Sequence, residues 1–210
     1  MDATEPASQA ASPERNVPVS RAAPPKRADA RRNYDRLVAA AAAVFAERGA
    51  DDASLEEIAR RAGVGIGTLY RHFPARQALL EAVYKDQVDG LEVLAGKLLA
   101  SESPGRALCE WMRAFVAFGR TKRVLSSALV ANKDSEVMSA CSMTLRGCTD
   151  ALLSRAQDAG EARPEVRSAD IMRLAHVLIM ATDAPTDPDQ PERLASLIVG
   201  SVLVPEADRC

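Results

Sequence analysis

Residues 54–73, SLEEIARRAGVGIGTLYRHF, define the ends of two short helices and the turn between them. Ser54 and Glu57 have the Ser-x-x-Glu spacing of a capping box, which marks the first turn of a helix. Gly63 is the residue type that ends a helix in a left-handed conformation. A second short helix is predicted from Ile66 to His72. The segment therefore predicts a small helix-turn-helix unit.

The rest of the chain continues this helical pattern. Apolar residues recur at three- and four-residue spacings, and no alternating β-branched or aromatic runs occur between turn residues. Helices are expected over residues 33–48, 54–62, 66–72, 104–122, 123–132, 135–159, 168–182 and 192–204, with one more that has Pro74 as its first residue and ends before Ser101. The sequence therefore predicts an all-α fold.

Composition separates the N-terminus from the rest of the chain. Residues 1–25 contain five of the 12 prolines and no glycine or aromatic residue, so a flexible tail with a basic end is expected over residues 1–30. The net charge is −2, but residues 26–85 hold 11 Lys and Arg against 8 Asp and Glu. A basic cluster that includes Arg31 and Arg32 is expected to form a flexible arm that reaches DNA phosphates or a minor groove.

Several classes of protein are disfavoured by the sequence. The four cysteines form no CxxC pair and no signal-peptide pattern is found, so a reduced, cytoplasmic protein is expected. No apolar run approaches the roughly 18 to 20 residues of a membrane span. HExxH, GxSxG and phosphate-loop motifs are absent, so neither an enzyme nor a cofactor is expected. With two histidines far apart, a metal site is not expected either.

The short helix predicted at residues 66–72 carries its polar residues on one side. If Leu69 and Phe73 face inward, small and hydrogen-bonding side chains face outward, where the DNA major groove would lie. The Tyr70 hydroxyl is expected at the rim for a phosphate contact, although its ring can also pack in the small core. His72 fits a base contact and a plain surface position equally well.

Three segments between residues 33 and 82 resemble the tetracycline-repressor (TetR) family of transcriptional regulators. They are VFAERGA, SLEEIARRAGV and GTLYRHFPARQALL. The resemblance implies that the second helix of the helix-turn-helix is a recognition helix. It also implies that the fourth helix joins this unit to an all-α domain that dimerises and binds a small molecule, and that the bound molecule releases the DNA.

The resemblance also implies roles for individual residues. Ser54 would cap its helix beside a phosphate, and Thr68, Tyr70 and other residues of the second helix would contact backbone or base edges. Arg76 stands where family members usually have lysine at the start of the fourth helix, and Gly65 stands where serine is common. The candidate DNA-contacting residues are Arg31, Arg32, Ser54, Gly65, Gly67, Thr68, Tyr70, Arg71, His72 and Arg76.

The second domain contains a line of aromatic residues on one helix and most of the methionines. Such a stripe is more often plain core, but methionine and aromatic side chains also suit an adaptable pocket for an apolar ligand. His176 fits a core or interface position or a hydrogen bond to a ligand, and Cys141 fits a small apolar residue better than half of a redox pair with Cys148. The candidate pocket residues are Trp111, Phe115, Phe118, Met138, Cys141, Met172 and His176.

The sequence thus favours a helix-turn-helix DNA-binding domain over residues 31–78 and a ligand-binding and dimerisation bundle over residues 79–210. The last two predicted helices are apolar on more than one face, which predicts a homodimer. The expected function is a repressor that binds double-stranded DNA at an inverted-repeat operator and leaves it when a small-molecule effector binds. The alternative is a helical partner-binding protein with a vestigial helix-turn-helix.

Overall fold

The computed structural model describes residues 26–130, 135–181 and 190–205. Within these ranges the backbone forms α-helices and no β-strand, apart from one isolated bridge between Ala162 and Leu203. The all-α prediction is therefore confirmed. The helices are α1 (Lys26–Arg48), α2 (Leu55–Ala62), α3 (Ile66–His72), α4 (Arg76–Leu99), α5 (Pro104–Val130), α6 (Glu136–Asp158), α7 (Ser168–Ala181) and α8 (Gln190–Val202).

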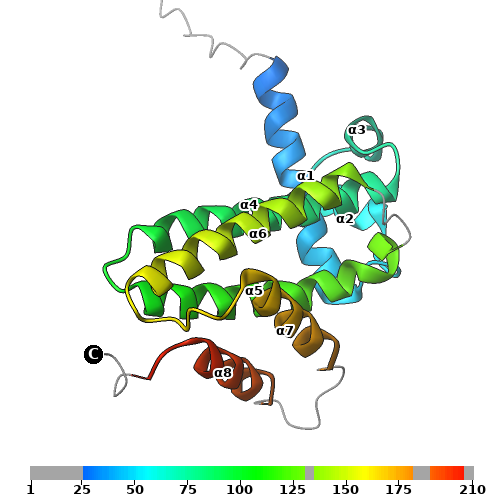
Figure 1. Cartoon of the computed structure of the whole chain (residues 1–210). Coiled ribbons are helices and arrows are strands. Elements are labelled where there is room, and N and C mark those ends of the chain that lie inside the picture. The colour runs from blue at the N-terminus through cyan, green and yellow to red at the C-terminus, as the bar shows by residue number, and fades with distance from the viewer. Residues whose placement is uncertain (1–25, 131–134, 182–189, 206–210) are drawn as a thin grey trace, which may run out of the picture.

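Helices α1, α2 and α3 pack together at the N-terminal end of one apolar core that continues into α4 to α8 (Figure 1). Leu37 and Phe45 of α1, Ile58 of α2 and Leu69 of α3 are almost fully buried in it. Phe73, which follows α3, is buried as well, so the predicted inward face of α3 is confirmed. Because this apolar side is fixed to α1 and α2, the opposite side of α3 faces away from the protein.

Helices α4 to α8 form the larger unit. Figure 1 shows α4 and α6 side by side, with α5 packed against both and α7 and α8 on the outer side of α5. The bundle core includes the fully buried side chains of Tyr84, Trp111 and Leu152. The Trp111 indole N–H donates to Thr149 Oγ1 at 3.0 Å, so this buried polar group is satisfied. No helix in the described parts of the chain combines the length and apolarity needed to cross a bilayer.

The expected boundary of α1 was wrong, because the helix begins at Lys26 and residues 26–30 belong to it and not to a tail. Arg31 Nε donates to Asp35 at 3.0 Å, and Arg32 bonds to Asp29 in the first turn. These i,i+4 and i,i+3 pairs stabilise a helical turn that has no apolar periodicity. The predicted flexible basic arm is therefore helical from Lys26 onward, and the rest of the predicted tail, residues 1–25, lies outside the described residues.

Two other predicted helix boundaries were also wrong. The first residue of α4 is Arg76, with Ala75 as its N-cap, and Pro74 lies one residue before the cap. The predicted helices 104–122 and 123–132 are one continuous helix, α5, as far as Val130. The sequence has no glycine or proline between residues 120 and 130, so nothing in it breaks the backbone hydrogen bonds there. Residues 131 and 132 lie outside the described part.

Candidate DNA-binding surface and effector domain

The N-terminus of α2 is capped as the sequence predicted, but only by half of the capping box. Ser54 has extended backbone angles, and its Oγ accepts from the backbone N–H of Glu57 at 3.3 Å. The reciprocal bond from the Glu57 side chain is replaced, because Arg60 and Arg61 bind that carboxylate at 2.7 to 2.9 Å. The Ser54 hydroxyl donates instead to Glu56 at 2.8 Å.

The turn between α2 and α3 depends on two glycines with different roles. Gly63 has φ 65°, and the next N–H, that of Val64, donates to Ala59 O at 3.0 Å, which closes the C-terminus of α2. Gly65 is the N-cap of α3 with ordinary extended angles and provides no side-chain cap. The two exposed residues at the start of α3, Ile66 and Gly67, follow it directly, so the backbone can approach a ligand closely there.

The outward face of α3 contains the predicted candidates. Gly67, Tyr70 and Arg71 are exposed, whereas Thr68 and His72 are half-buried. Tyr70 is 47% exposed, so its ring lies at the surface and not in the small core. Arg71 forms no ion pair within 4.0 Å among the described residues, which leaves its charge available to a phosphate.

A line of ring contacts joins the start of α1 to the end of α3. The Tyr34 ring meets the His72 ring edge-on at 6.2 Å and the Phe73 ring at 5.1 Å. The Arg31 guanidinium lies 5.8 Å from the centre of the Tyr34 ring. Arg31 and Arg32 are both exposed on the same helix. His72 is therefore held by aromatic contacts at its half-buried position, and the basic residues of α1 have fixed positions relative to α3.

Ion pairs hold α2 against α1 behind this surface. Arg61 binds Glu47 of α1 through both terminal nitrogens, at 2.6 and 2.7 Å, and it also binds Glu57. Hydrogen bonds from Arg61 hold the pKa values of both carboxyls below their usual range, and these carboxylates raise the pKa of Arg61. Arg60 is also paired with Glu57, so both arginines of α2 have partners inside the protein.

Arg76 is used differently from the other candidates. Its Nη1 donates to the carbonyl of Ala50 at 2.6 Å, and its Nη2 donates to the carbonyl of Ala53. Both acceptors lie in the segment that joins α1 to α2. The sequence did not reveal this arrangement, because the two carbonyls are 26 and 23 residues away along the chain.

The predicted aromatic stripe is part of the bundle core. Trp111 stacks on Phe115 at 6.2 Å, Phe115 lies 6.4 Å from Phe118, and Phe118 lies 5.4 Å from Tyr84 of α4. All four rings are buried. Burial, with a smaller contribution from Cys141, raises the pKa of Tyr84 to about 12. The structure thus brings the three predicted aromatic residues together and adds Tyr84, which the sequence analysis missed.

The remaining pocket candidates are more dispersed. Cys141 is buried and Met138 and Met172 are partly buried against the core, but His176 is exposed on α7. The core position considered for His176 is therefore wrong, and its interface position stays a prediction. Cys141 and Cys148 form no disulfide within the described residues, and burial raises the pKa of Cys148. A thiol with a raised pKa is a weaker nucleophile at neutral pH, which favours the apolar role.

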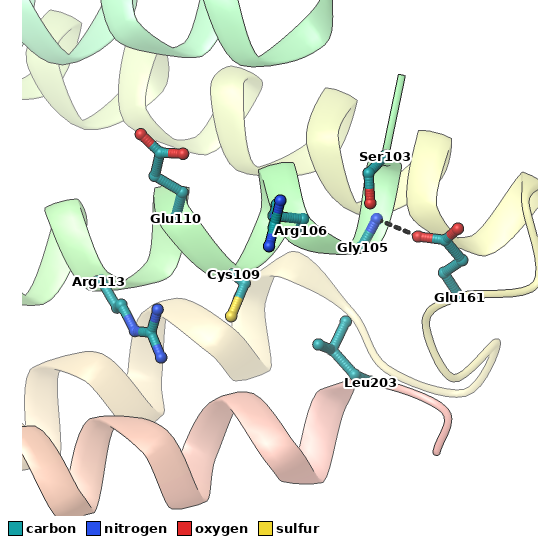
Figure 2. A pocket seen from close by; sticks show the side chains of 8 residues that line it. All are labelled: Ser103, Gly105, Arg106, Cys109, Glu110, Arg113, Glu161 and Leu203. Atoms are coloured by element: carbon teal, nitrogen blue, oxygen red, sulfur yellow. Dashed lines mark hydrogen bonds between the residues drawn. The ribbon is translucent and has the colours of Figure 1, made fainter. Parts of the chain in front are cut away.

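A separate cavity of about 700 Å³ lies between the start of α5, the α6–α7 connection and the end of α8. Figure 2 shows Arg106, Cys109 and Arg113 along α5, and the Glu161 carboxylate that accepts from the N–H of Gly105. None of its lining residues was predicted, because they come from three segments far apart in the sequence. The lining residues are Ser103, Gly105, Arg106, Cys109, Glu110, Arg113, Glu161 and Leu203.

Helices α7 and α8 expose large apolar side chains. Leu174 and Val177 of α7 and Leu197 of α8 are all exposed, the last two by 62% and 69%. Apolar side chains on neighbouring helices at the outer side of the bundle are typical of an interface with a second chain.

The fold and the exposed α3 surface define the class of helix-turn-helix DNA-binding proteins. Residues 37–83 match the family described as bacterial regulatory proteins, tetR family, and residues 103–200 match the SbtR-like transcriptional regulator C-terminal domain. The crystal structure of the TetR transcriptional regulator SCO0520 from Streptomyces coelicolor is 37% identical, covers 81% of this chain and 98% of its own, and has a TM-score of 0.70. This chain belongs to the TetR family of transcriptional regulators.

Two further relatives agree with this family. The TetR transcription regulatory protein from Mycobacterium vanbaalenii is 35% identical over 86% of this chain and 100% of its own, with a TM-score of 0.66. The HTH-type transcriptional regulator TtgW of Pseudomonas putida is 39% identical over 66 residues, which are 31% of this chain and 49% of TtgW. The chain thus spans about half the length of this curated relative, and the family assignment rests on the longer matches.

Proposed function

We propose that the protein is a cytoplasmic, ligand-responsive repressor that binds an inverted-repeat DNA operator as a homodimer and acts without enzymatic chemistry. The observation that carries this proposal is the outward face of α3. Exposed Gly67, Tyr70 and Arg71 and half-buried Thr68 lie on a helix whose other side is anchored in a core. The vestigial helix-turn-helix finds no support, because α3 keeps an outer face on which Tyr70 and Arg71 are exposed.

Some contacts to DNA would position the protein on the phosphate backbone, and others would recognise the base sequence. The Tyr70 hydroxyl and the unpaired Arg71 would bind phosphates, and the N-terminus of α3 at Gly65 would add backbone N–H groups. Thr68 and His72 would reach base edges in the major groove. The N-terminal turns of α1, with Arg31 and Arg32, would add sequence-independent attraction for phosphates.

Dimerisation would place two copies of α3 on two half-sites. A single helix-turn-helix makes few base contacts, and two of them one helical turn or a multiple apart multiply the specificity. The exposed Leu174, Val177 and Leu197 support a two-fold interface in which α7 and α8 pair with the same helices of a second chain.

The effector would bind in the bundle and act on α4. Tyr84 of α4 touches Phe118 of α5, so a molecule that separates the aromatic residues would shift α4 and alter the spacing of the two recognition helices. The polar cavity in Figure 2 lies against α5, and Arg106 and Arg113 line it together with Glu110 and Glu161, so it would suit a polar effector.

The test is a selection of the purified protein against sheared genomic DNA at about physiological salt, followed by sequencing. An enriched inverted repeat, with affinity that falls steeply as salt rises, is expected. Tyr70→Phe should then weaken binding without changing the preferred sequence, whereas Thr68→Ala should change the preference. If folded, ligand-free protein enriches no sequence, the proposal fails.

A further inference from the structure

We propose that Arg76 is a positioning residue that holds the α1–α2 connection to the start of α4, and that it does not contact DNA phosphate. This inference rests on the proposed DNA-binding function and concerns how the recognition helix is held in place. It departs from the role that the family resemblance implies for this position.

The guanidinium of Arg76 is already committed to backbone acceptors. Nη1 donates to Ala50 O at 2.6 Å and Nη2 donates to Ala53 O, and the environment of both bonds is partly buried. Ala50 and Ala53 are themselves almost fully buried. A phosphate contact would require at least one of these carbonyls to lose its charged donor, which is unfavourable for an acceptor with little access to water.

The two acceptors lie where they control the start of α2. Ala53 directly precedes Ser54, the N-cap of α2, and α2 leads through the glycine turn into α3. The charge of Arg76 also makes a small contribution to lowering the pKa of Glu56, which lies in the first turn of α2. Arg76 therefore provides a second connection between α4 and the helix-turn-helix, in addition to the covalent link through Pro74 and Ala75.

The other end of α4 is held in a similar way. Arg155 of α6 donates to the carbonyls of Leu98, at 3.4 Å, and of Ser101, which follows the helix. Arg76 thus joins the N-terminus of α4 to the α1–α2 connection, and Arg155 joins its C-terminus to α6. A displacement of α4 in the effector bundle would be passed through Arg76 to the α1–α2 connection and from there to α3.

Arginine at this position is required by geometry. The planar guanidinium carries two terminal nitrogens in a fixed fork, which matches two separate carbonyls, whereas a lysine ammonium is a single point charge. A lysine at residue 76 would keep the charge but lose the two-point bond. A positioning role therefore predicts that Arg76→Lys weakens DNA binding, whereas a phosphate contact predicts that it keeps the wild-type affinity.

The experiment compares Arg76→Lys and Arg76→Gln with the matched control Arg71→Gln, which removes an exposed, unpaired arginine of α3. Dissociation constants are measured across a series of salt concentrations, with the DNA duplex that the wild-type protein enriches in the selection described above. Both Arg76 variants are expected to weaken binding about tenfold per half-site, as for the loss of one net charged hydrogen bond, or about a hundredfold for the dimer, with an unchanged salt slope. Arg71→Gln is expected to reduce the slope by about 0.9 per lost contact, or about 1.8 per dimer.

Hydrogen exchange of the DNA-free protein gives a second readout. The peptide that covers residues 49–59 should exchange faster in Arg76→Lys than in wild type, while peptides from α6 stay unchanged. Wild-type affinity for Arg76→Lys, combined with a reduced salt slope for Arg76→Gln, would overturn the proposal, as would unchanged exchange at residues 49–59. If wild-type protein binds no DNA, the proposed function fails, and the exchange measurement still tests the role of Arg76.

Discussion

Replacing Gly63 with alanine tests the turn that presents α3. The left-handed backbone at φ 65° costs an alanine about 1 to 2 kcal/mol. The new Cβ would collide with Arg36 Nη2, so the guanidinium must move and lose its 3.1 Å bond to Gly63 O, a loss of about 0.5 to 1 kcal/mol. The smaller entropy of the unfolded alanine chain offsets about 0.4 to 1 kcal/mol. The net expected loss in the free energy of unfolding is about 1.5 kcal/mol.

Urea unfolding at fixed protein concentration measures this loss as a lower midpoint at unchanged slope. Two controls separate the contributions. Gly49→Ala has φ 81° but no neighbour within 4 Å of its Cβ, so it reports the backbone strain without the Arg36 contact. Gly96→Ala in α4 also meets nothing within 4 Å and should stabilise the helix by about 0.5 to 1 kcal/mol.

The outcome is decided by the order of the three variants. If Gly63→Ala is no more destabilised than Gly49→Ala, the Arg36 bond contributes nothing to the stability of the turn. If Gly63→Ala is as stable as the wild type, residue 63 does not adopt the left-handed conformation on which this prediction depends.

Three further predictions concern the interface, the core and the acid response. Leu197→Glu should convert the dimer to a monomer in light scattering and weaken operator binding. Trp111→Phe should lower the free energy of unfolding by about 1 to 3 kcal/mol, because Thr149 loses its buried donor. The hydrogen bond from Arg61 lowers the pKa of Glu47 in the folded state below its usual value of 4.5. The Arg61–Glu47 pair therefore stabilises the fold above pH 4.5, and this contribution is lost as the pH falls through the lowered pKa. Arg61→Gln should therefore flatten the fall in urea midpoint between pH 7 and pH 3.

The sequence predicted the helix-turn-helix well because its signals are local. Ser54 and Gly63 specify the ends of α2 through bonds to residues three to five positions away, and Leu69 and Phe73 specify which side of α3 is buried. The start of α1 was missed because its first turns are stabilised by charge pairs, whereas the search relied on apolar spacing.

Other features could not be predicted because they depend on distant residues. Arg76 bonds to two carbonyls in the segment that joins α1 to α2, and nothing in its neighbours along the chain specifies them. The cavity of Figure 2 combines Gly105 with Glu161, 56 residues away. His176 lies on an apolar helix, but which side of that helix meets α5 is decided by packing, and the structure leaves its side chain exposed.

The chain contains a single tryptophan, and Trp111 is fully buried in the bundle of α4 to α8 with its indole N–H bonded to Thr149. Its fluorescence emission therefore comes from the bundle alone, with no contribution from the DNA-binding unit. A small molecule that enters beside Phe115 would change the colour or intensity of this emission. The protein thus carries its own optical probe, and a library of compounds can be screened for the effector without any label.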